Sequence, residues 1–281
     1  METVRHIGEL REAVHKLREG GRKIALVPTM GALHAGHARL VEEGLKRADR
    51  VVASIFVNPR QFGQGEDFEQ YPRSEEADRE KLAEAGVSLL WAPAPGEVYP
   101  EGFATNVSVG GLGEGLCGGA RPGHFDGVAT VVAKLFNQLR PDIALFGEKD
   151  YQQLAVIRRM AADLDFDIEI VGVPTVREAD GLALSSRNAY LSAAERREAV
   201  ALPRALRAGA EALRNGIEPG EALADVEAAL FKGGFDMIDY VELRDAETLE
   251  PLETLDRPAR LLAAARIGTT RLIDNVAVEP I

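Results

Sequence analysis

The sequence has little cysteine and no long apolar run. A single cysteine, Cys117, occurs in 281 residues, which excludes an internal disulfide and fits a reducing compartment. No apolar stretch approaches the ~20 residues needed to cross a bilayer. The first residues, Met1 to His6, lack the basic-then-apolar order of a signal peptide. We therefore expect a cytoplasmic protein that does not contact the membrane.

Positive charge is also scarce. Lysine and arginine number 33 against 45 aspartates and glutamates, which gives a formal net charge of -12 at pH 7. This balance argues against wide contact with nucleic acid or anionic lipid. An anionic substrate must therefore be held by local positive groups. The length suggests roughly two domains.

The first part of the chain alternates between strand and helix patterns up to about residue 175. Apolar spacing predicts helices over 10–17, 40–48, 74–86, 128–139 and 154–164, and strands over 24–27, 51–57, 87–91, 105–109, 143–146 and 168–173. The glycine-rich stretch 110–123 should be irregular. Such alternation predicts an α/β domain over 1–175, with a mostly parallel sheet covered by helices on both faces.

The pattern changes after residue 176. Ser192 and Glu195 form a capping-box pattern that opens a helix to about Asn215, and Pro219 opens another to Gly233. Strands are expected over 237–243, 259–265 and 270–276. We predict a smaller α+β domain over 176–281.

The stretch from Ile24 to His37 combines a predicted buried strand, two glycines and two histidines at a helix start. Helix N-terminal amides favour anions, and Gly31 and Gly36 let a ligand approach the backbone. His34 and His37 add N–H donors for phosphate oxygens. The alternative is that both histidines are ordinary polar residues on an exposed first turn. A zinc site is disfavoured, because too few further ligands lie nearby.

Three further polar clusters follow predicted strands, where ligands bind in open parallel sheets. Residues 58–63 include Asn58 and Gln61, whose amides suit a hydroxy acid. Residues 147–153 include Lys149, which can neutralise a phosphate, and Gln153 one turn later. Residues 184–188 offer hydroxyls and a guanidinium. Taken singly, each cluster also fits a plain solvated loop or helix start.

The combination and order of these motifs resemble the pantothenate synthetase family, also called pantoate–β-alanine ligases. The matching motifs are Pro-Thr-Met-Gly-Ala-Leu-His-x-Gly-His (28–37), Phe-Val-Asn-Pro-x-Gln-Phe (56–62), Arg-Pro-Gly-His-Phe (121–125), Phe-Gly-Glu-Lys-Asp-Tyr-Gln-Gln (146–153), Pro-Thr-Val-Arg-Glu-x-Asp-Gly-Leu-Ala-x-Ser-Ser-Arg-Asn (174–188) and Arg-Ile-Gly-Thr-Thr-Arg-Leu-Ile-Asp-Asn (266–275). The resemblance covers essentially the whole chain. Residue 184 is often methionine in the family and is leucine here, which preserves an apolar contact.

This resemblance implies a Rossmann-like nucleotidyltransferase domain, similar to class I aminoacyl-tRNA synthetases, with a C-terminal domain that covers the active site. The implied reaction is the ATP-dependent condensation of (R)-pantoate with β-alanine through pantoyl adenylate. ATP is the co-substrate, Mg²⁺ accompanies its triphosphate, and no protein ligand of the metal is identified. Members of the family are usually cytoplasmic homodimers.

The resemblance also implies roles for individual residues. His34, His37 and Lys149 would act on the phosphates, with His37 the preferred proton donor. ATP binding is implied for Met30, Gly31, Ala32, Leu33, His34, Ala35, Gly36, His37, Gly147, Glu148, Lys149, Asp150, Val176, Leu184, Ser185, Ser186 and Arg187. Gln61 and Gln153 would bind pantoate, with Gln61 also bordering the β-alanine site. Asn58, Tyr71 and Arg121 are further pocket candidates.

Other interpretations compete with this one. A related adenylyltransferase would use a similar histidine motif without forming an amide, but the clusters of Gln61 and Gln153 argue against it. A dinucleotide-binding oxidoreductase would need Gly-x-Gly-x-x-Gly after the first strand, where this sequence has Thr-Met-Gly-Ala-Leu-His. A non-catalytic nucleotide-binding module is the third alternative.

Overall fold

The computed structural model describes residues 1–280, which divide into two compact units. The first unit comprises Met1–Glu148 and Val156–Pro174. The second comprises Lys149–Ala155 and the chain from Thr175 onward. A short segment from the middle of the sequence, Lys149–Ala155, therefore belongs with the C-terminal part of the chain.

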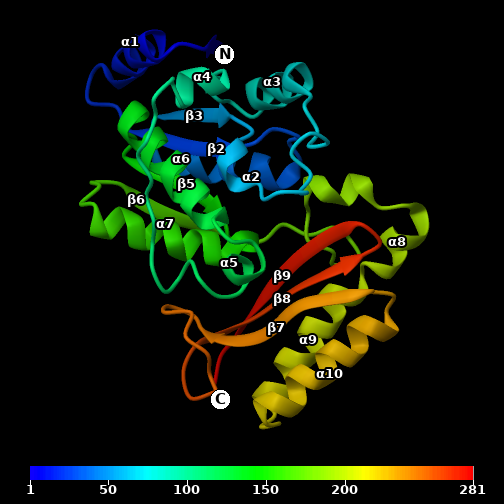
Figure 1. Ribbon diagram of the computed structural model, residues 1–281. Coiled ribbons are helices and arrows are strands. Elements are labelled where there is room, and N and C mark those ends of the chain that lie inside the picture. Colours follow the sequence, from blue (N-terminus) through cyan, green and yellow to red (C-terminus); the bar gives the residue numbers. More distant parts are fainter. Residues whose placement is uncertain (281) are drawn as a thin grey trace. The chain divides into compact units, whose positions relative to one another are not determined.

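The first unit is built on a six-stranded sheet (Figure 1). All neighbouring strands are parallel, in the order β1-β4-β3-β2-β5-β6. The strands are β1 (Glu2–Val4), β2 (Ile24–Thr29), β3 (Arg50–Ile55), β4 (Leu89–Trp91), β5 (Ile143–Gly147) and β6 (Glu169–Val173). The strand order reverses between β2 and β5, and ligands of parallel sheets bind beyond the carboxyl ends of the strands at such a point.

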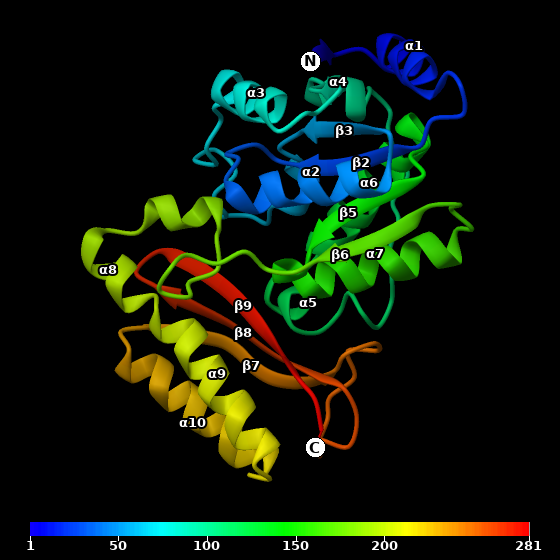
Figure 2. The same ribbon diagram turned by 180° about the vertical axis from the view of Figure 1, so that it is seen from behind.

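Helices cover both faces of this sheet, as the alternating pattern predicts. The two views show α2 and α6 on opposite faces (Figure 1, Figure 2). On the α2 side, Leu40 and Val41 pack into a core with Val27 of β2 and Val51 of β3. The helices that begin in this unit are α1 (Ile7–Arg18), α2 (Ala35–Arg47), α3 (Glu75–Glu84), α4 (Pro95–Val98), α5 (Cys117–Ala120), α6 (His124–Leu139) and the 3-10 helices η1 (Pro59–Gln61) and η2 (Glu148–Asp150).

The second unit contains an antiparallel sheet in the order β7-β8-β9. Its strands are β7 (Met237–Asp245), β8 (Ala259–Ile267) and β9 (Thr270–Val278). Leu206 of α9 and Leu230 of α10 are fully buried in a core with Leu261 of β8. The helices are α8 (Ala193–Glu198), α9 (Ala201–Arg214), α10 (Pro219–Lys232), the 3-10 helix η3 (Ser186–Tyr190) and α7 (Tyr151–Asp163), which begins here and ends in the first unit.

The structure corrects three element predictions. The stretch 110–123, which was predicted to be irregular, contains the short helix α5 (Cys117–Ala120). Residues 105–109 do not form a strand, because the Val107 amide donates to Oγ1 of Thr130 (2.9 Å) on α6 instead of to another strand. The predicted helix from Ser192 is interrupted after Glu198. Pro203 has no N–H for the carbonyl of Ala199, so the helix restarts at Ala201.

Candidate active site

The loop between β2 and α2 is held in an unusual backbone conformation. Gly31 has φ 88° and Ala32 has φ 51°, a region that residues with a side chain rarely adopt. Thr29 supports the turn, because its hydroxyl donates to the carbonyl of Ser54 (2.7 Å) and accepts from the amide of Gly31 (3.2 Å). The predicted strand, tight loop and helix start are all present.

A buried carboxylate holds the same loop from the side of α3. Asp78 is fully buried and accepts hydrogen bonds from the amides of Ala32 (2.7 Å) and Leu33 (2.9 Å). One turn along α3, the Lys81 ammonium donates to the carbonyl of Leu33 (2.8 Å). The amides of Ala32 and Leu33, which precede α2, therefore donate to a protein carboxylate. No sequence pattern indicated this pairing, because Asp78 lies in a run of charged residues typical of a solvated helix.

The two histidines are oriented by backbone amides. Nδ1 of His34 accepts from the amide of Gly36 (3.1 Å), and Nδ1 of His37 accepts from the amide of His34 (3.2 Å). An amide can only donate, so the neutral form of each ring carries its proton on Nε2. The ring centroids are 4.2 Å apart. The loop thus presents two adjacent imidazoles of the same tautomer, each with an Nε2–H donor.

Gly36 makes the position of the His34 ring possible. A Cβ atom at residue 36 would lie 2.8 Å from Cε1 and 2.9 Å from Nδ1 of His34. Real Cβ atoms do not approach other atoms so closely. Glycine is therefore required here for close packing against the imidazole.

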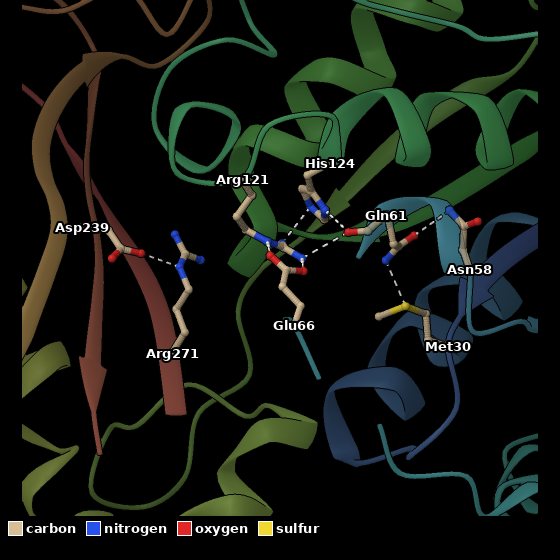
Figure 3. A network of polar contacts seen from close by, with 8 residues as sticks. All are labelled: Met30, Asn58, Gln61, Glu66, Arg121, His124, Asp239 and Arg271. Atoms are coloured by element: carbon tan, nitrogen blue, oxygen red, sulfur yellow. Dashed lines mark hydrogen bonds and ion pairs between the residues drawn. The ribbon is translucent and has the colours of Figure 1, made fainter. Parts of the chain in front are cut away.

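Gln61 is buried on η1, and its amide is held in one orientation. Asn58 donates from Nδ2 to Oε1 of Gln61 (3.1 Å) and to the carbonyl of Gly127 (3.0 Å), and its Oδ1 accepts from the hydroxyl of Tyr99 (2.9 Å). Nε2 of Gln61 lies on the other side, 2.9 Å from Sδ of Met30 (Figure 3). Gln61 therefore keeps its N–H donors on the side of Met30, in the loop after β2.

The backbone of Gln61 is held as firmly as its side chain. Its carbonyl accepts from Nδ1 of His124 (2.7 Å) and from Nη2 of Arg121 (3.2 Å). Arg121 also donates to Nε2 of His124 (3.0 Å) and pairs through two nitrogens with the carboxylate of Glu66 (2.7 and 2.6 Å) (Figure 3). Because arginine only donates, Nε2 of His124 is the acceptor and Nδ1–H is the donor to Gln61.

The electrostatics of Glu66 reflect this pairing. Burial alone would raise the pKa of the Glu66 carboxyl, but the hydrogen bonds and positive charge of Arg121 outweigh it and lower the pKa to about 2. Glu66 thus stays ionised at neutral pH and pairs with Arg121, which donates to the carbonyl of Gln61. The sequence did not single out Glu66, which lies in a glycine-rich loop, or assign His124 a role.

Another candidate of the first unit, Tyr71, is buried. Its ring packs edge to face against Phe62 with centroids 5.9 Å apart. The three predicted pocket residues around η1 each contact protein groups there. Asn58 bonds to Gln61, Tyr71 packs on Phe62, and Arg121 donates to the carbonyl of Gln61.

Gly147 at the end of β5 and Glu148 at the start of η2 still belong to the first unit. The second unit carries the other predicted site residues in two segments. In the first, Nζ of Lys149 lies 3.7 Å from Oδ1 of Asp150, and Gln153 follows on α7. In the second, the amide of Leu184 donates to the carbonyl of Val176 (3.0 Å). The hydroxyl of Ser185 caps η3 by accepting from the amide of Arg187 (3.3 Å). Ser186 and Arg187 form the start of η3.

Among residues 1–280, no group of three or more histidines, cysteines, aspartates or glutamates is arranged to hold an ion. The same stretch contains no helix with the length and apolar character needed to cross a membrane.

Comparison with known proteins gives matches over the whole chain. The family model described as pantoate-beta-alanine ligase matches residues 2–277. The pantothenate synthetase of Sphingopyxis alaskensis is 63% identical over 278 residues, covering 99% of this chain and 100% of the relative. That of Rhizorhabdus wittichii is 62% identical over 280 residues, covering 100% and 99%.

Solved structures agree with the sequence matches. The crystal structure of pantothenate synthetase from Thermus thermophilus superposes with a TM-score of 0.94 at 53% identity, covering 100% of both chains. A pantoate-beta-alanine ligase from Francisella tularensis, crystallised with beta-gamma ATP and beta-alanine, gives a TM-score of 0.82 at 32% identity, covering 98% of this chain and 97% of the other.

Proposed function

The chain belongs to the pantoate–β-alanine ligase family, and we propose that its residues catalyse the ATP-dependent condensation of pantoate with β-alanine by orienting substrates and neutralising charge. The pantoate carboxylate attacks the α-phosphate of ATP and pyrophosphate leaves. The amine of β-alanine then attacks the acyl carbon of pantoyl adenylate and AMP leaves. A carboxylate is already ionised at neutral pH, so the first step needs alignment and not an enzyme nucleophile.

The observation that carries this proposal is the matched orientation of His34 and His37. With Nδ1 of each ring engaged by a backbone amide, both rings offer Nε2–H. We assign these donors to the phosphate oxygens of ATP, with His37 the preferred proton donor as pyrophosphate leaves. The loop residues Met30 to Leu33, Ala35 and Gly36 would line the nucleotide, with Ala32 and Leu33 keeping their amides on Asp78.

Further residues are proposed to bind ATP. Lys149 would neutralise charge that develops on the phosphates. The segment that contains Lys149 would also contribute Gly147, Glu148 and Asp150. A second ATP-binding segment would contribute Val176, Leu184, Ser185, Ser186 and Arg187. With a chain charge of -12, such local cations and N–H donors are what can attract a polyanion.

Pantoate is proposed to bind through Gln61 and Gln153. The fixed amide of Gln61 would donate from Nε2 to a pantoate oxygen and leave the carboxylate able to attack, which a bidentate arginine would not. Gln61 would also border the β-alanine site. Asn58 and Arg121 would act through Gln61, because their hydrogen bonds hold its side chain and its carbonyl. Tyr71 would shape the same pocket by packing on Phe62.

Magnesium, homodimer formation and a cytoplasmic location are part of the same proposal. The half-exposed carboxylate of Asp150 offers a single oxygen ligand, which fits an ion held mainly by the triphosphate and water. When bound, the ion would supply charge neutralisation to the phosphates.

ATP–pyrophosphate exchange tests the proposed function. We expect exchange to require pantoate and magnesium but not β-alanine, and β-alanine to trigger AMP release. Exchange that proceeds without pantoate, or is undetectable with every combination of substrates, would overturn the assignment. Exchange with pantoate but no amide product on adding β-alanine would instead identify an adenylyltransferase.

A further inference from the structure

Strand β9 contains two neighbouring buried polar residues, Asp274 and Asn275, that no step of the proposed reaction uses. They are 2% and 3% exposed. We propose that they are positioning residues, which hold the two ATP-binding segments of the second unit on a single strand. The inference rests on the proposed roles of Lys149 and of residues 184–187.

Asn275 fixes the backbone of Lys149. Its Nδ2 donates to the Lys149 carbonyl (3.0 Å), and its Oδ1 accepts from Nη1 of Arg260 (3.1 Å). Because a guanidinium only donates, Oδ1 must face Arg260 and the NH₂ group must face Lys149. The orientation of the amide is therefore set by chemistry and not only by packing.

The same contact network includes the residue after Asp150. The guanidinium carbon of Arg260 lies 4.1 Å from the centroid of the Tyr151 ring, which is within cation–π range. The Tyr151 hydroxyl donates to the carbonyl of Ala246 (2.7 Å). These contacts explain why Lys149–Ala155 belongs to the second unit, although β8 and β9 lie far along the chain.

Asp274 fixes the other segment through Arg177. Its carboxylate receives two hydrogen bonds from Arg177 (2.6 and 2.9 Å), and its side chain is 1% exposed. Arg177 also donates to the carbonyl of Gly181 (3.1 Å) and pairs with Ala183 across a short antiparallel bridge. Asp274 thereby holds the turn that leads directly into residues 184–187.

Adjacent residues of a strand point to opposite faces. Asp274 and Asn275 can therefore hold two different segments without competing for space. Both segments are attached to β9, which keeps Lys149 and Ser185 to Arg187 in one fixed arrangement. This gives a function to the Arg-Ile-Gly-Thr-Thr-Arg-Leu-Ile-Asp-Asn motif (266–275).

A double-mutant cycle tests the action of Asn275 through Lys149. Asn275→Asp keeps an acceptor for Arg260 but places an oxygen against the Lys149 carbonyl. We expect it to slow single-turnover adenylation by about 10- to 100-fold, which is the order of the loss that a misplacement of about 1 Å can cause. In the Lys149→Ala background the same change should slow the reaction by less than about 2-fold, because its target is gone.

Controls separate the possible failures. Asn137→Asp makes the same chemical change at an asparagine whose Nδ2 also donates to a backbone carbonyl, that of Ala133 (3.0 Å), and should leave the rate unchanged. If Lys149→Ala does not slow adenylation, the proposed function of Lys149 fails. If Lys149→Ala slows it and the Asn275→Asp effect multiplies fully in that background, the positioning role is refuted.

Loss of the contact between Asp274 and Arg177 should change the KM for ATP more than kcat. Arg177→Lys keeps the positive charge but loses the paired hydrogen bonds, and it is the milder alternative to Asp274→Asn should that variant not fold. Both should raise the KM for ATP by about 10-fold with a smaller change in kcat, because the displaced segment binds the nucleotide. Asp163→Asn, at an exposed pair with Arg159 (2.7 Å), is the control. An unchanged KM for ATP in a folded Arg177→Lys variant would contradict the assignment.

Discussion

At the scale of single residues, the candidate site depends on groups that orient other groups. Four acceptor atoms each receive a hydrogen bond from the protein. They are Nδ1 of His34, Nδ1 of His37, Oε1 of Gln61 and the carbonyl oxygen of Gln61. The histidine tautomers and the orientation of the Gln61 amide are therefore fixed before any substrate binds. These are the groups whose N–H donors are proposed to contact the substrates. This is preorganisation, which lets dipoles act without reorienting during the reaction.

The variant Gly36→Ala tests whether the position of the His34 ring matters for adenylation. The added Cβ would lie 2.8 Å from the His34 ring, so the ring must move while the rest of α2 can stay. We expect adenylation to slow by roughly 10- to 100-fold, with little loss of thermal stability, because alanine favours a helix over glycine by about 1 kcal/mol. Measurements are single-turnover rates and thermal unfolding.

The control for this variant is Gly8→Ala in α1, where an added Cβ would meet nothing within 4 Å. That variant should keep the full rate and gain slight stability. A Gly36→Ala protein as fast as the wild type would show that the position of the His34 ring does not matter for adenylation.

At the scale of elements, the apolar pattern predicted most helices and strands, including β2 and β3, whose residues are mostly buried. It was wrong for residues 105–109, whose amide pairs with a side chain of α6, and it missed the short edge strand β1. It also could not reveal Asp78. The first turn of α3 is rich in glutamate, as in a solvated helix, yet Asp78 is fully buried. Only the fold brings the amides of Ala32 and Leu33, more than forty residues away, to its carboxylate.

Asp78→Asn should therefore affect stability and activity together. An amide can accept from one of the two loop amides, but its NH₂ would face the other N–H and leave it unpaired. We expect the free energy of unfolding to fall by about 1–3 kcal/mol, measured by urea denaturation, and adenylation to slow as the loop relaxes. Glu80→Gln removes an exposed carboxylate from the same helix and should change neither. Equal stability of the two variants would argue that Asp78 does not anchor the loop.

At the scale of the whole molecule, the two contact units do not follow the chain order. The second unit starts again at Thr175, close to where the sequence pattern changes, but it also contains Lys149–Ala155. That membership depends on contacts with Ala246, Arg260 and Asn275. Local patterns carry no information on such distant partners, so the sequence alone assigned this segment to the first domain.

The lowered pKa of Glu66 also makes the free energy of unfolding depend on pH. Glu66 has a folded-state pKa of about 2, below its ordinary value of 4.5. A group with a lowered pKa stabilises the fold fully above its unfolded-state pKa, and this stabilisation is lost as the pH falls toward the folded-state value. The window in which Glu66 contributes its pH dependence therefore runs from about 4.5 down to about 2.

Glu66→Gln should flatten the acid limb of the stability curve. The wild type should lose on the order of 1–3 kcal/mol through Glu66 in this window, after allowance for solvent screening at a side chain that is 24% exposed. The variant lacks this titration, so its free energy of unfolding should be lower than that of the wild type at pH 7 and approach it near pH 2. Urea denaturation at steps of pH measures both curves. Glu69→Gln, at an exposed position in the same loop, should give a curve parallel to the wild type, and a parallel curve for Glu66→Gln would mean that the Arg121 pair does not couple to folding.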